Sequence, residues 1–138
     1  MNPDAITLVV VADGRRARLL EQPRIDGPLH DRPEWLADVK EHHDHAAPSH
    51  ITHSGDARDR AEKAFLTGLA KRLEGLAAKH HFDHLVLIAP PRALGHLREA
   101  LSPALVKKLV GSDPHDRVDA TIITLEAAVH AARYATAA

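Results

Sequence analysis

The sequence predicts an α/β domain built on a mixed five-stranded sheet flanked by helices. Three observations lead to this prediction. Short β-branched or fully apolar runs alternate with stretches of helical period in the second half of the chain, as parallel strands joined by helical crossovers require. An Asp-Gly pair near the N-terminus predicts a hairpin, so one strand pair is antiparallel. The 138 residues suit one domain, which we assign to residues 1–138.

The first three strands are expected before residue 41. Ala5–Ala12 is apolar and β-branched, as in a central strand. Asp13-Gly14 turns the chain, and Arg15–Glu21 returns with a roughly alternating pattern. After the polar loop Pro23–Pro33, Glu34–Lys40 is expected to form the third strand, and a short helix is the alternative.

The long helix and the fourth strand follow a polar, histidine-rich loop at 41–57. Ala57–His81 is predicted to be the longest helix, because apolar residues recur at helical spacing from Ala61 onward. Asp56 is its expected N-cap. Leu85–Ala89 is fully apolar, as in a strand that is covered on both faces. Pro90-Pro91 ends this strand and starts the next helix.

The last third of the chain is expected to complete the sheet. Beyond Pro103 the apolar face continues through Leu105 and Leu109 as a broken helix. Gly111–Arg117 is predicted to be a polar turn, Val118–Ile123 the last strand, and Leu125–Tyr134 a final helix capped by Thr124. With right-handed crossovers, this βββαβαβα order gives the strand order 3-2-1-4-5 of the ribonuclease-H-like layout.

Composition excludes several classes of site. The chain has no cysteine, so disulfides and thiolate metal sites are absent, and a reducing cytoplasm fits. The apolar run Ile6–Ala12 is too short for a signal-peptide core or a membrane span. A net charge of −1 gives no global attraction to nucleic acid or membranes. We expect a cytoplasmic protein with no cofactor, no membrane contact and no readout of DNA sequence.

The segment Phe82–Val110 contains a series of short motifs, which are Phe82-Asp83, Leu85-Val86-Leu87, Ala89-Pro90-Pro91-Arg92, Leu94-Gly95, Leu97-Arg98 and Ala100-Leu101-Ser102, with Val10–Gly14, Ala17-Arg18 and Arg60–Leu73 elsewhere. In these motifs the chain resembles the family named for a "protein required for attachment to host cells". The likeness covers most of the chain. That bacterial family in turn resembles the middle domain of archaeal and eukaryotic class-1 peptide-chain release factors. The resemblance implies a role near the ribosome or tRNA.

This chain lacks residues that two related enzymatic activities, peptidyl-tRNA hydrolysis and two-metal nuclease chemistry, require. Release factors carry a Gly-Gly-Gln tip in the loop before the long helix, but this chain has no Gly-Gly pair and its only glutamine is Gln22. Ribonuclease-H-type nucleases hold two metals with carboxylates on the first strand, the long helix and the fourth strand. Asp13 and Glu62 are candidates for two of these positions, but Leu85–Ala89 offers none. We therefore assign no catalytic residue.

An anion site is predicted at the carboxyl ends of the parallel strands. The strand order reverses between the first and fourth strands, and open α/β sheets bind ligands at such a point. Asp13, Arg15 and Arg16 follow the first strand, and Arg92 opens the helix after the fourth. A helix N-terminus favours an anion, so a phosphate or carboxylate is the expected ligand. The alternative is that Pro-Pro-Arg is only a stop signal with a solvated arginine.

The histidine-rich loop is the second candidate site. His43 and His45 point the same way in an extended chain, and with His50 and His53 they are candidate ligands for zinc or nickel. The spacing matches no standard zinc pattern, and a solvated polar loop explains it equally well.

The preferred hypothesis is that the protein is a non-catalytic binding domain that contacts the ribosome, tRNA or another macromolecule. One alternative is a hydrolase that acts through the loop at 41–57, with or without a metal. The other is a structural homo-oligomer such as a homodimer.

Overall fold

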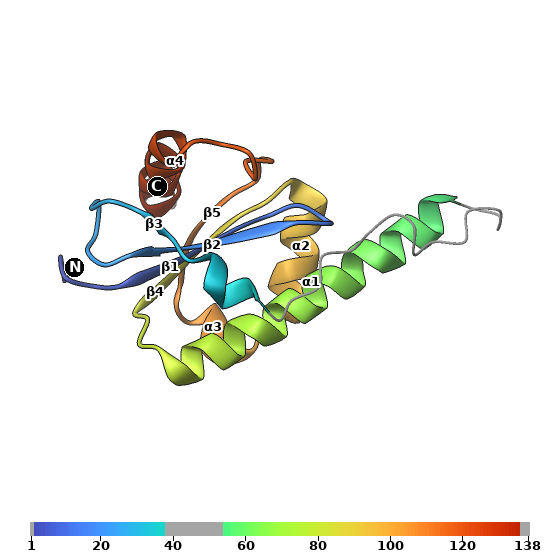
Figure 1. Ribbon diagram of the computed structural model, residues 1–138, viewed down its shortest axis with the longest axis horizontal. Helices are drawn as coiled ribbons and strands as arrows, with labels where there is room; N and C mark the ends of the chain where they lie inside the picture. The colour runs from blue at the N-terminus through green and yellow to red at the C-terminus, as the bar shows by residue number, and fades with distance from the viewer. Residues whose placement is uncertain (1, 38–53, 136–138) are drawn as a thin grey trace.

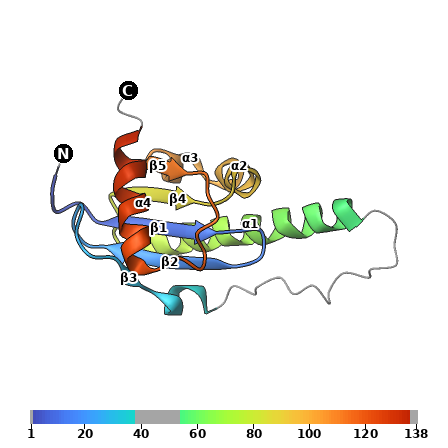
Figure 2. The same ribbon diagram turned by 90° about the horizontal axis from the view of Figure 1, so that it is seen from above.

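The computed structural model describes residues 2–37 and 54–135. A five-stranded sheet lies between two layers of helices (Figures 1 and 2). In chain order the elements are β1 (Thr7–Ala12), β2 (Ala17–Gln22), β3 (His30–Asp31), the 3₁₀ helix η1 (Pro33–Leu36), α1 (Ser54–Lys79), β4 (His84–Ile88), α2 (Pro91–Ala100), α3 (Pro103–Val106), β5 (Leu109–Asp113) and α4 (Ile122–Ala135).

The strand order is β3-β2-β1-β4-β5, which confirms the predicted fold class. β1 pairs antiparallel with β2, with Thr7 opposite Gln22, and parallel with β4, with Val9 opposite Val86. β4 pairs parallel with β5, so the carboxyl ends of β1, β4 and β5 share one edge of the sheet. This shared edge is where open α/β sheets place ligands.

The central strands are buried on both faces, which explains their continuous apolar runs. Leu8 and Val10 of β1 pack into the core under α1, α2 and α3, whereas Val9 and Val11 pack into the core under α4. The alternation follows from the two-residue period of a strand. β1 and β4 therefore hold the two cores together.

The prediction of a third strand at Glu34–Lys40 is wrong. Residues Pro33–Leu36 form η1, which matches the short-helix alternative, and residues 38–40 lie outside the described part. β3 is only His30–Asp31, within the predicted loop, and it pairs with β2. Trp35 packs edge-on against Phe82, with ring centroids 5.6 Å apart, so a tertiary contact accounts for the tryptophan that the sequence placed in a strand.

The prediction of the last strand at Val118–Ile123 is also wrong, because β5 occupies Leu109–Asp113. Gly111–Arg117 is therefore not simply a turn, and the helical segment after Pro103 ends at Val106 instead of extending through Leu109. Val118 is buried as a loop residue in the core under α4. α4 begins earlier than predicted, at Ile122.

The caps of two helices differ from the predicted ones. Thr121 Oγ1 accepts a hydrogen bond from the Thr124 backbone N–H at 3.2 Å, so Thr121 caps α4 and Thr124 lies inside it. α1 begins at Ser54, so Asp56 lies within that helix and not before it. No helix in the described ranges is long and apolar enough to cross a membrane.

α1 extends well past the sheet (Figures 1 and 2). Its 26 residues correspond to about 39 Å at the usual helical rise. The buried positions begin at Phe65, whereas residues 57–64 are exposed or half-buried. The N-terminal turns of α1 therefore stand out at the end of the molecule towards which β1 and β4 run (Figure 2).

Candidate functional site

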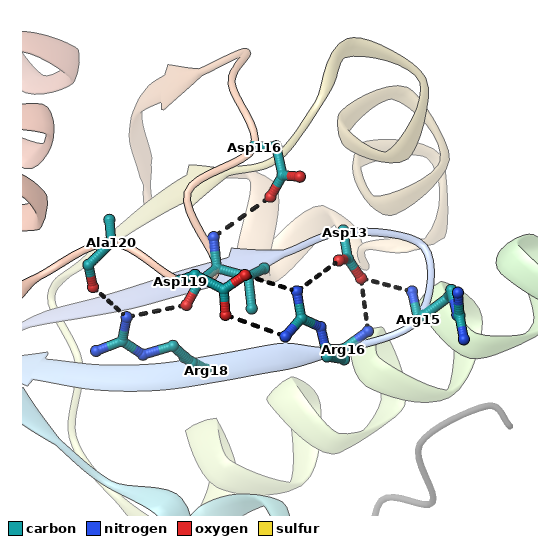
Figure 3. Close-up of polar contacts among 8 residues, drawn as sticks. Asp13, Arg15, Arg16, Arg18, Asp116, Asp119 and Ala120 are labelled. Carbon is teal, nitrogen blue, oxygen red and sulfur yellow. Dashed lines mark hydrogen bonds and ion pairs between the residues drawn. The ribbon is translucent and has the colours of Figure 1, made fainter.

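The β1–β2 turn lies at the shared carboxyl edge of the sheet. Asp13 Oδ1 accepts hydrogen bonds from the backbone N–H groups of Arg15 at 2.7 Å and Arg16 at 2.6 Å. The Asp13 N–H donates to Arg16 O at 3.0 Å. The Asp13 carboxylate therefore holds the turn, as Asp side chains commonly do. Both arginines are exposed, and the Arg16 side chain lies against Asp13 and Asp119 (Figure 3).

Arg16 forms a two-pronged ion pair with Asp119, which follows β5 by six residues (Figure 3). The two N···O distances are 3.0 and 3.1 Å, and a third contact joins Arg16 to Asp13 at 3.6 Å. The hydrogen bond from Arg16, and then its charge, lower the pKa of Asp119, and the same pair raises the pKa of Arg16. Asp119 was not predicted as a site residue, because the β-branched run Val118–Ile123 predicts a strand at this position.

Arg18 fastens the loop at 114–121 to the hairpin (Figure 3). Its Nη1 donates to the carbonyl oxygens of Val118 at 3.0 Å and Ala120 at 2.7 Å, and its Nη2 lies 3.2 Å from Asp31 Oδ2. Arg16 directly precedes β2 and Arg18 lies within it, and both contact the loop at 114–121. The separation of two residues between Arg16 and Arg18 was the sequence feature that could have predicted their shared role in holding this loop.

Arg92 reaches the same end of the molecule from the first turn of α2. Pro90 precedes this helix and no side chain caps it, and Arg92 forms an ion pair with Asp59 of α1. One helical turn along α1, Glu62 packs against Gly14 so closely that a Cβ there would lie 2.5 Å from Glu62 Cδ. α1 therefore touches both halves of the predicted site, Arg92 through Asp59 and the hairpin turn through Glu62.

The structure thus places Asp13, Arg15, Arg16 and Arg92 at the predicted edge, where Arg16 and Arg92 already contact carboxylates. The second prediction, a metal site at His43, His45, His50 and His53, lies outside the described residues. Among the residues that are described, no group of three His, Asp or Glu side chains is arranged to hold a metal ion.

A polar cluster that the sequence analysis did not identify lies at the end of β5. Asp113 is buried, and its two carboxylate oxygens contact His115 Nδ1 and Arg117 Nε. The Asp113 carbonyl accepts a hydrogen bond from the Ala89 N–H at 3.0 Å, which fixes the cluster beside the end of β4. The spacing of an acid followed by His and Arg at the second and fourth positions was the available signal. A buried carboxylate requires such partners.

No curated protein matches the chain. A family model described as bacterial archaeo-eukaryotic release factor family 12 matches residues 6–129. Because this match covers nearly the whole chain, the protein belongs to bacterial archaeo-eukaryotic release factor family 12.

Proposed function

We propose that this domain is a non-catalytic binding module that contacts RNA of the translation machinery, in tRNA or the ribosome. The contact surface is the sheet edge with the projecting part of α1. We call its exposed cations the basic edge: Arg15, Arg16, Arg58, Arg60, Lys63 and Arg92. Membership of a release-factor family supports a translation partner, and the arrangement of charge at this edge supports RNA as the ligand.

The observation that carries the proposal is the difference in exposure between cations and carboxylates at this end of the molecule. The cations of the basic edge are all exposed, whereas Asp13, Asp59 and Glu62 at the same edge are half-buried. The Asp13 carboxylate accepts hydrogen bonds from the backbone of the turn, and the Asp59 carboxylate forms an ion pair with Arg92. An approaching polyanion therefore meets exposed guanidinium and ammonium groups at this edge, together with the exposed carboxylate of Asp119 on Arg16, although the whole chain carries a net charge of −1.

The start of α2 adds backbone donors to the same surface. The first N–H groups of a helix have no partner within it, and the helix dipole favours a negative group there. Arg92 lies in this first turn and is 63% exposed. We expect one phosphate of the RNA to bind here, beside the Arg92 guanidinium, which can take two phosphate oxygens side by side.

Binding without peptidyl-tRNA hydrolysis fits the residues available. The only glutamine of the chain, Gln22, is 1% exposed. Its side-chain amide donates to Gly27 O at 3.1 Å and its oxygen accepts from Arg133 at 3.0 Å. Gln22 is therefore a structural residue, and the chain has no other glutamine that could serve in a Gly-Gly-Gln tip. The resemblance to the host-attachment family stays a prediction.

A salt series with labelled tRNA and with ribosomes tests the proposal. We expect binding at low salt that weakens steeply between roughly 50 and 200 mM, because each phosphate contact releases counterions. The double variant Arg60→Gln, Lys63→Gln should weaken binding and reduce the slope of log K against log salt by about two. The matched control is Lys71→Gln, Lys79→Gln, which removes the same charge from the other part of α1.

Two results would contradict the proposal. One is the absence of any binding to tRNA or ribosomes at low salt. The other is an equal loss of affinity in the control variant, because that would indicate general charge attraction and not a basic edge.

A further inference from the structure

A buried arginine of α4 binds three neighbouring strands of the sheet. Arg133 is only 4% exposed. Its Nη2 donates to Thr7 Oγ1 at 2.8 Å and to Gln22 Oε1 at 3.0 Å, and its Nη1 contacts His84 Nδ1 at 2.9 Å. Thr7, Gln22 and His84 belong to β1, β2 and β4, which lie side by side. One guanidinium thus joins the last helix to the middle of the sheet.

The hydrogen-bond partners of this buried cation are neutral groups: a hydroxyl, an amide oxygen and an imidazole nitrogen. An arginine has only donors to offer, so His84 must accept through Nδ1 and carry its proton on Nε2. Arg133 Nε has no hydrogen-bond partner within the described structure. Burial, and then the charge of Arg133, lower the pKa of His84, whereas Asp83 opposes this shift.

We propose that the contact between His84 and Arg133 is an acid-sensitive latch, which holds α4 on the sheet at neutral pH and loosens it on acidification. Protonation of His84 removes the acceptor for Arg133 and sets two cations at hydrogen-bond distance. Arginine cannot relieve this repulsion by losing its own proton. Water screens this repulsion less than it would on an open surface, because Arg133 is buried and His84 is half-buried.

Other charged groups near the latch do not cancel this response. Asp83, next to His84, already binds His81 Nε2 at 2.7 Å and the Ile6 N–H at 2.9 Å. Asp26 attracts the charge of Arg133 and lies 2.9 Å from His130 of α4, with Tyr134 OH 3.4 Å away. The Asp26–His130 pair strengthens when His130 is protonated, but its side chains are 41% and 61% exposed, and exposed pairs contribute little.

The sign of the effect follows from the lowered pKa of His84. Between its folded-state pKa and the ordinary value near 6.5, the unfolded chain binds more protons than the folded chain. Stability from this site is therefore present above the ordinary pKa and is lost as the pH falls through the folded-state value. α4 covers Val9, Val86 and the other residues of the core beneath it, so the loosening of α4 would expose apolar surface.

The first test is the histidine NMR titration of the full chain. We expect the His84 ring to titrate below 6.5 and, over the same pH range, the amide protection factors of α4 to fall more than those of residues 65–77 of α1. If His84 titrates at or above 6.5, or if α4 shows no selective loss of protection, the proposal is overturned.

The second test uses His84→Asn, whose amide oxygen can replace Nδ1 as acceptor but does not titrate. We expect its urea midpoint to decline less than that of the natural chain between pH 7.5 and 5. The matched control, His81→Asn, removes an exposed histidine three residues away, together with its contact to Asp83. Apart from the effect of losing that contact, its urea midpoint should decline with pH as it does in the natural chain. His84→Gln provides a second acceptor variant if His84→Asn does not fold. Parallel pH curves for the natural chain and the folded acceptor variant would refute the latch.

Discussion

At the scale of single residues, Arg16 holds two oxygens of Asp119 side by side, as an arginine holds a phosphate. Asp119 is 81% exposed and Arg16 is 45% exposed, so water and ions compete readily for both groups. An RNA phosphate that binds Arg16 must displace this carboxylate. If the basic edge binds RNA as we propose, we therefore expect Asp119 to limit its affinity.

The variant Asp119→Asn should bind tRNA more tightly than the natural chain. We expect a gain of roughly two- to fivefold at low salt, the range that a single exposed ion pair spans. Asp116→Asn is the control, because it removes an equal charge from the same loop, where Asp116 caps the Val118 N–H at 3.4 Å. Fluorescence anisotropy measures both affinities, and equal gains in the two variants would rule out a specific effect of the Arg16 contact.

The sequence placed Asp13, Arg15, Arg16 and Arg92 at the carboxyl edge because each follows a strand that could be recognised. Their role as an anion site stays a prediction. Asp119 and Asp59, which contact two of the arginines, could not be foreseen in the same way. Arg16 and Asp119 are 103 residues apart in the chain, and no local pattern encodes such a pairing.

At the scale of elements, β5 shows that sequence periodicity alone is not sufficient to locate a strand. Leu105 and Leu109 keep helical spacing, and Val118–Ile123 contains β-branched residues, so both local signals were misleading. The strand forms at Leu109–Asp113 because β4 offers hydrogen-bonding groups there, as in the bonds from Leu85 N to Lys108 O and from Ala89 N to Asp113 O. Tertiary pairing outweighed local propensity at this edge strand.

Gly111 of β5 should be irreplaceable for a steric reason. A Cβ at this position would lie 2.3 Å from the Ala132 carbonyl oxygen of α4, which is backbone and cannot turn away. We expect Gly111→Ala to lower the free energy of unfolding by about 1–3 kcal/mol or more, as overpacking does. Urea denaturation followed by circular dichroism measures this loss.

The matched control is Gly95→Ala in α2. Apart from the backbone of α2 itself and the two adjacent residues, nothing lies within 4 Å of a Cβ built on Gly95, so the substitution removes only a poor helix former. It should raise the free energy of unfolding by about 0.5–1 kcal/mol. If both alanine variants change stability alike, close packing of β5 against α4 is not the cause.

At the scale of the whole molecule, strand order and layering were predictable because they depend on features spread along the chain. The Asp-Gly hairpin, the fully apolar β4 and the long helix determine most of the topology, and each was recognised. The short elements were predicted less well: the two residues of β3 were placed in a loop, and the helix after Pro103 was predicted to run through Leu109, whereas α3 has only four residues. Elements of that length carry too few residues for a periodic signal.

The uneven burial of α1 leads to a prediction for the whole fold. Residues 57–64 contribute no buried position, whereas Phe65, Leu66, Leu69 and Leu73 are buried under the sheet. Local opening requires less free energy where few apolar contacts must be broken. Amide hydrogen exchange should therefore be faster in residues 57–64 than in residues 65–77, and slowest in β1 and β4.

The same measurement with tRNA present joins the fold to the proposed function. If the basic edge holds RNA, exchange should slow in residues 57–64 and in the β1–β2 turn, which together carry most of its cations, and stay unchanged in α4 on the opposite face of the sheet. α4 serves as the internal control because it belongs to the same molecule and experiences the same solvent. Protection of α4 with no change at residues 57–64 would place the RNA on the other face and contradict the assignment of the basic edge.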